Sequence, residues 1–168
     1  MILSKRINFS GLTLIECTVA TTISVMFLSS LFVMNSASMQ SLRLARETAC
    51  ASQVLQQRIE SMRIANWHQI TDANWIRNNL LNTLAAGTDQ LKEVTETLTL
   101  IPYGSSATET TQLIRTGGNA RVVTANTTLL KENAMKIIWV VDYTGIPNNH
   151  PKSRQTVAIL AKGGMAKW

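Results

Sequence analysis

The feature that most constrains this chain is a long stretch, residues 12–86, that contains neither glycine nor proline. Because these two residues interrupt helices most strongly, a continuous helix is permitted throughout the stretch. Its first 23 residues comprise 15 apolar residues, seven Ser or Thr, and a single acid, Glu16. At 1.5 Å per residue they would measure roughly 34 Å, enough to cross a hydrocarbon core of about 30 Å. We therefore predict a membrane-spanning helix over 12–34.

The charges around this segment predict its orientation. Lys5 and Arg6 precede it, so the positive-inside rule keeps the N-terminus cytoplasmic and places the bulk of the chain outside. Glu16 lies inside the segment, where a charge costs on the order of 3 kcal/mol at the bilayer centre, and it is therefore a candidate functional residue. The alternative is that Glu16 reaches the nearby cytoplasmic interface and has no special role.

Net charge gives little indication of a nucleic-acid partner. The formal charge is +6, with 16 Lys and Arg against 10 Asp and Glu, and it falls to +4 without Lys5 and Arg6. The remaining cations are scattered and form no run that would follow a phosphate backbone.

Beyond residue 34 the pattern becomes that of an amphipathic helix, which we expect to continue over 35–66. Polar residues fill the other faces, with Arg43 and Glu47 spaced as an i,i+4 pair. We expect the upper part of the apolar stripe to pack under the protein's own head and the lower part to be available to other subunits. The stripe recurs at near-helical spacing and consists of Leu44, Ala51, Leu55, Ile59, Met62 and Ala65.

Residues 67–168 are expected to form an α+β head. A modest helical pattern, in which Trp67 and Trp75 would cap the core, ends near Gly87 and gives way to alternation with a period of two. The strongest pattern, apolar on both faces, predicts an interior strand at 135–143 that pairs with its successor as a hairpin. The fold class is therefore α+β, a long N-terminal helix carrying a small antiparallel sheet, with strands expected at 95–101, 112–115, 120–124, 135–143 and 155–161.

Cys17 and Cys50 are the only cysteines. Within one helix they would lie roughly 50 Å apart, which excludes an intrachain disulfide. We expect both to be small packing residues, and an intersubunit bridge through Cys50 is the alternative.

The residues at the start of the apolar segment resemble a known processing site. Ser10 and Gly11 are followed by Leu12, Thr13, Leu14, Ile15 and Glu16, after a short basic leader and before about 20 apolar residues. This arrangement resembles the N-terminal site of type IV prepilins and of the pseudopilins of type II secretion. In that family a membrane peptidase cuts after the glycine and methylates the new N-terminus, and a long helix carries a small antiparallel sheet.

The resemblance implies a leader over 1–11, cleavage between Gly11 and Leu12, and a structural subunit that assembles through its N-terminal helix. Its partners would be a prepilin peptidase, other pilin or pseudopilin subunits and the inner membrane, and it would be incorporated into a pilus or pseudopilus. Cleavage would leave an α-amino group on Leu12, and the Glu16 carboxylate could offset the cost of burying that charge on a neighbouring subunit.

Leu12 stands where the family most often has Phe, which weakens the match slightly. Two other departures favour a minor pilin or pseudopilin over a major pilin, because no glycine or proline interrupts the apolar segment and no pair of cysteines lies near the C-terminus. The resemblance does not separate a pilus from a secretion or DNA-uptake system, or a tip position from a shaft position.

No sequence motif indicates an enzyme, a cofactor or a metal site. His68 and His150, the only histidines, are expected to be an ordinary helix-end residue and a solvated loop residue. One alternative reading is a secreted binding protein with a signal peptide cut near Ser38. A single-span membrane enzyme is the other alternative, although no catalytic triad supports it.

Overall fold

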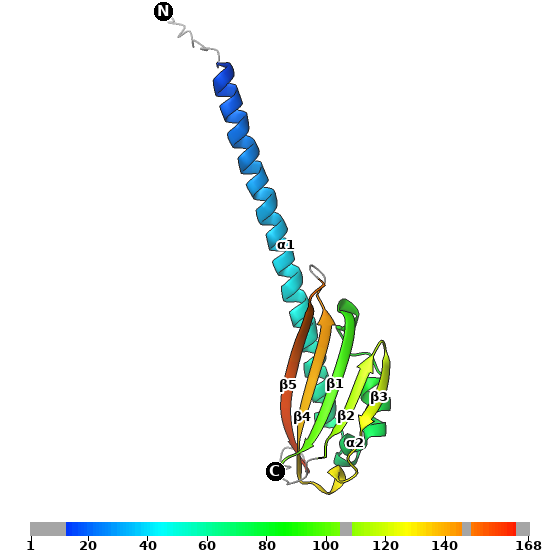
Figure 1. The fold of residues 1–168 in the computed structure, drawn as a ribbon. Coiled ribbons are helices and arrows are strands. Elements are labelled where there is room, and N and C mark those ends of the chain that lie inside the picture. The colour runs from blue at the N-terminus through cyan, green and yellow to red at the C-terminus, as the bar shows by residue number, and fades with distance from the viewer. Residues whose placement is uncertain (1–12, 105–108, 146–148, 164–168) are drawn as a thin grey trace, which may run out of the picture. The chain divides into compact units, whose positions relative to one another are not determined.

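The computed structural model describes residues 13–104, 109–145 and 149–163. A long helix comes first, short helical segments follow, and strands make up most of the remainder (Figure 1). The elements in chain order are α1 (Leu14–Ile64), α2 (Trp67–Thr71), α3 (Ala73–Trp75), the π-helix η1 (Ile76–Leu81), the 3₁₀ helix η2 (Thr88–Gln90), β1 (Lys92–Pro102), β2 (Thr111–Thr116), β3 (Asn119–Thr124), the 3₁₀ helix η3 (Leu129–Lys131), β4 (Ala134–Thr144) and β5 (Pro151–Ala161).

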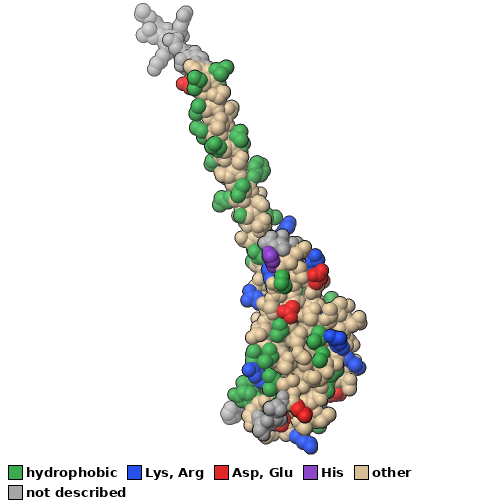
Figure 2. All heavy atoms as spheres, viewed as in Figure 1, with side chains coloured by type: hydrophobic (Ala, Val, Ile, Leu, Met, Phe, Trp, Pro, Cys, Tyr) green, Lys and Arg blue, Asp and Glu red, His purple; other side chains and the backbone are tan. Residues whose placement is uncertain are grey.

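The chain divides into two compact units, the first ending at Ser41 and the second beginning at Leu42. In the first unit α1 is exposed throughout its described length, and Figure 2 shows apolar side chains along it. Its hydroxyls turn back to the helix: Thr18 donates to the Ile15 carbonyl at 2.8 Å, and Ser24 to the Ala20 carbonyl at 2.8 Å. The same pattern holds for Thr21, Thr22, Ser29 and Ser30. These polar groups are therefore satisfied without water, as a lipid environment requires.

In the second unit, the described residues form a five-stranded antiparallel sheet in the order β3-β2-β1-β4-β5. The sequence prediction of an α+β fold, with a long N-terminal helix apolar enough to span a membrane and a small antiparallel sheet, is confirmed. β4 lies between β1 and β5, as expected for the strand that is apolar on both faces, and it pairs with β5 as the predicted hairpin.

All five expected strands are present, but their bounds differ. The largest difference is in β5, which begins at Pro151 and not near residue 155. Proline cannot donate to a sheet ladder, which made this residue look like loop, but it is tolerated at the first position of an edge strand. β1 begins earlier than expected, at Lys92. Its register with β4 shifts between Lys92 and Thr95, where Glu93 adopts a φ of +53°, so the alternation with a period of two does not extend back to the start of the strand.

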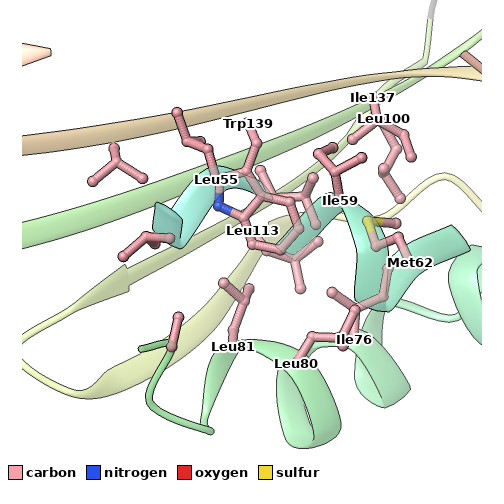
Figure 3. Packing of buried hydrophobic residues seen from close by; sticks show 14 of the residues in the cluster. Leu55, Ile59, Met62, Ile76, Leu80, Leu81, Leu100, Leu113, Ile137 and Trp139 are labelled. Carbon is pink, nitrogen blue, oxygen red and sulfur yellow. The ribbon is translucent and has the colours of Figure 1, made fainter. Parts of the chain in front are cut away.

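The hydrophobic core lies between one face of the sheet and the helical segments (Figure 3). The predicted alternation is confirmed in β4, where each second residue is buried, and in β1, where Leu98 and Leu100 are fully buried. Trp67 and Trp75 are partly buried against this core, as expected. Besides Leu98 and Leu100, the core includes Val54, Leu55, Ile59 and Met62 of α1, Ile76, Leu80 and Leu81 of η1, Leu113 of β2, Leu129 of η3, and Met135, Ile137, Trp139 and Val141 of β4.

The apolar stripe of α1 packs under the head only in its upper part. Ala51, Leu55 and Met62 are buried, whereas Leu44 is 39% exposed because the buried stretch of the helix begins at Glu47. Glu47 itself was expected on a polar face and is instead buried, with 4% of its surface exposed. That expectation was wrong because spacing along one helix does not reveal which strand covers it.

Candidate functional site

The start of α1 is closed by a reciprocal pair of hydrogen bonds between Thr13 and Glu16. The Thr13 backbone N–H donates to Glu16 Oε2 at 2.8 Å, and the Glu16 backbone N–H donates to Thr13 Oγ1 at 3.3 Å. The Thr13 hydroxyl also donates to Glu16 Oε2 at 3.0 Å. This is the capping-box arrangement, which satisfies backbone donors that a helix N-terminus otherwise leaves open.

The capping box gives Glu16 a structural role that the sequence reasoning missed. The signal was available, because Thr followed three residues later by Glu, just before an apolar run, is the pattern of a capping box. Glu16 is exposed and bonded within its own chain. Both a capping role and a role in assembly are compatible with this geometry.

The remaining predicted site residues of the N-terminal region lie outside the described residues. These are Gly11 and Leu12 at the expected cleavage point and Lys5 and Arg6 in the leader. The described helix begins at Leu14, close behind that point. It is long and apolar enough to cross a membrane, and none of the side chains in its most apolar window is buried within the structure.

No protein-family model, curated protein or solved structure matches this chain in the three comparisons made.

The head holds a buried charged cluster made of Arg58, Glu96 and Arg115. Glu96 is fully buried, and both arginines are 3% exposed. Arg58 donates to Glu96 through Nε at 2.8 Å and Nη2 at 2.9 Å, and Arg115 donates through Nη1 at 2.7 Å. The cluster joins the helix α1 to the strands β1 and β2 and carries a formal charge of +1.

Every guanidinium nitrogen of Arg58 has a hydrogen-bond partner, whereas Arg115 Nε has none. Beyond its bonds to Glu96, Arg58 donates to the carbonyls of Leu80 and Thr83, and its guanidinium carbon lies 5.8 Å from the centre of the Trp139 ring. Arg115 Nε is buried without a partner. The two arginines therefore contribute unequally to the stability of the head. Arg58 holds the loop after η1 against the sheet, whereas Arg115 adds a buried charge that is incompletely paired.

A second ion pair fixes α1 to the edge strand β5. Lys152 Nζ lies 2.8 Å from Glu47 Oε2, and the two side chains are 28% and 5% exposed. Lys152 also lies 6.0 Å from the centre of the Tyr143 ring. The ion pair holds the N-terminal end of β5 against α1.

Among the described residues, no group of three or more His, Cys, Asp or Glu side chains is placed to hold a metal ion. His68 and His150 are exposed and are not near each other in the chain. Cys17 is exposed, and Cys50 is half-buried beside Gly87, with both thiols free.

Proposed function

We propose that the chain is a structural subunit of a type IV pilus or a type II secretion pseudopilus, of the minor pilin or pseudopilin kind. In this account the inner membrane holds the subunit through α1 before assembly, and the head lies outside the cytoplasm. A prepilin peptidase cuts after Gly11, and other pilin or pseudopilin subunits are its partners. The chain acts by assembly and not by catalysis.

One observation carries the proposal. An exposed apolar helix, capped at Thr13 directly behind the expected cleavage point, continues without a break into a segment that forms the core of an antiparallel sheet head. An ordinary secretion signal has no reason to share a helix with the core of the mature domain. Cleavage near Ser38 would separate the chain in mid-helix, since Ser38 lies well inside α1.

Glu16 is proposed to contribute its charge to assembly. In the separate subunit its carboxylate accepts from Thr13. In a filament it would lie close to the new α-amino group of a neighbouring subunit, where opposite charges reduce the cost of burying either group. The two roles of Glu16, the cap and the charge, can be separated by substitution.

The test compares Glu16→Gln with Glu16→Ala. Glutamine keeps the capping-box acceptor but removes the charge, whereas alanine removes both. We expect both variants to be processed normally and both to fail to enter filaments sheared from cells. Gly11→Val serves as the reference for blocked processing, because the family's peptidase cuts after a glycine.

Two results would count against the proposal. Normal incorporation of Glu16→Gln, with loss only in Glu16→Ala, would assign Glu16 to helix capping alone. Normal processing of Gly11→Val would remove the cleavage site on which the subunit assignment depends.

A further inference from the structure

The two edges of the sheet differ in how they are protected against pairing with other chains. β3 has six residues, and its pairing with β2 is interrupted by a register shift. β5 has 11 residues and pairs with β4 along its whole length without an irregularity. Short or bulged edges resist pairing with other strands, whereas long regular edges accept them. By length and regularity β5 is therefore the edge better suited to a further strand, from Lys152 onward, since Pro151 has no N–H to donate.

No described strand pairs with the outer edge of β5, which is the last strand in the sheet order (Figure 1). In an antiparallel ladder alternate residues direct their N–H and C=O groups to opposite sides. About half of the backbone groups of β5 therefore point away from β4, on the side where no described strand pairs with them.

Two apolar side chains of β5 are exposed on the face of the sheet opposite the core. Val157 is 49% exposed and lies opposite Ile138 of β4, and Ile159 is 53% exposed and lies opposite Lys136. A strand added beside β5 would cover these two apolar side chains. Cross-strand contacts of this kind stabilise sheet pairing.

The charges on β5 select the kind of strand that can be added. Residues 151–168 contain no Asp or Glu. Lys152 is paired with Glu47, which leaves Arg154 on the strand and Lys162 just past its end as exposed cations among the described residues of this segment. A second copy of β5 would bring like charges together, which is unfavourable across a strand pair. An acidic segment would be attracted.

A recess of about 730 Å³ adjoins the strand and offers further polar contacts. Thr156 of β5 lines it together with Gln53, Gln56 and Gln57 of α1, and the ion pair of Glu60 and Arg63 lines it as well. These amides can donate to carboxylate oxygens as well as accept.

We propose that the outer edge of β5 binds an extended acidic segment of another protein by strand addition. Backbone hydrogen bonds would supply affinity, and the exposed cations would supply the preference for acidic sequences. This binding depends only on the head, so it would stand even if the chain were not processed at Gly11 or assembled into a filament.

The test uses the full chain in micelles of an uncharged detergent and a fluorescent peptide that alternates valine with glutamate. The peptide has about ten residues, the upper end of the usual strand length. Fluorescence anisotropy measures its binding. We expect saturable binding and protection of β5 amides from hydrogen exchange. N-methylation at alternate peptide residues should weaken binding about tenfold or more, because several backbone hydrogen bonds are lost together.

Arg154→Glu is the informative variant and Arg121→Glu on β3 is its matched control, since both arginines are exposed on edge strands. We expect Arg154→Glu to weaken binding at least about fivefold and Arg121→Glu to leave it unchanged. Circular dichroism would verify that both variants fold. The proposal is overturned if the peptide does not bind, if N-methylation has no effect, or if both variants lose binding equally. Pairing of β5 with a second copy, seen as dimers that the peptide cannot disrupt, would also contradict it.

Discussion

The buried cluster in the head makes the strongest prediction about stability. Glu96→Gln keeps the shape of the side chain but removes the one negative charge between Arg58 and Arg115. Two buried guanidinium groups then face a neutral amide, whose NH₂ group also opposes their donors. Because Glu96 is fully buried, water cannot reach this position to solvate the two guanidinium groups.

The size of the effect follows from this burial. Removing one partner of a buried ion pair costs about 3–5 kcal/mol, a large part of the 5–15 kcal/mol that holds a typical domain folded. Arg115→Met should cost clearly less, because it removes a cation whose Nε has no partner and leaves the neutral pair Arg58–Glu96. The order of the two substitutions is therefore predicted as well as the magnitude.

Urea denaturation in detergent micelles, followed by tryptophan fluorescence, measures both variants. Trp139 is fully buried beside Arg58 and reports on the head. With an m-value of about 2 kcal/mol per M, a loss of about 4 kcal/mol moves the midpoint down by about 2 M. Glu60→Gln is the surface control, since the Glu60–Arg63 pair at 3.5 Å is exposed and contributes at most about 0.5 kcal/mol.

The reasoning is refuted if Glu96→Gln destabilises the head no more than Arg115→Met does. The same conclusion follows if its midpoint shift equals that of Glu60→Gln. Either result would mean that charge balance does not govern this cluster.

Three further substitutions test other features of the head. Gly87→Ala should lower the unfolding free energy by about 1–3 kcal/mol, because Gly87 has a φ of +91° and a new Cβ would lie 3.3 Å from the Cys50 carbonyl oxygen. Gly118→Ala should lower it less, because Gly118 has a similar φ of +88° but a new Cβ there would meet no atom within 4 Å. Lys152→Met should lower the unfolding free energy by about 1–3 kcal/mol, since it leaves the buried Glu47 without this partner. The midpoint of urea denaturation measures all of these variants. Equal midpoint shifts for the two glycine variants would contradict the first prediction, and an unchanged midpoint for Lys152→Met would contradict the second.

The periodic parts of the fold could be predicted from the sequence because periodicity reflects burial directly. The absence of glycine and proline allowed α1, and the alternation around Leu98 and Ile137 located β1 and β4. The short elements between α1 and β1 could not be delimited, because their helical pattern is too brief to define bounds. The start of β5 at Pro151 could not be predicted, because proline is tolerated in a strand only at an edge or at the first position, and the position of a strand within the sheet is not visible in the sequence.

The charged cluster escaped prediction for a different reason. Glu96 shares the alternation of Leu98 and Leu100, so the pattern already placed an acid on the buried face. Arg58 lies four residues before Met62 on the buried side of α1. The sequence pattern indicated that each position faces the core. The contact between Arg58 and Glu96 depends on how α1 packs against the sheet, which no periodic pattern in a single sequence indicates.

The central claim concerns the N-terminus and is tested most directly by mass spectrometry of the protein extracted from membranes of cells that contain a prepilin peptidase. The account predicts a mature chain that begins at Leu12 with a methylated α-amino group. An intact chain beginning at Met1, or a chain beginning near Met39, would contradict it.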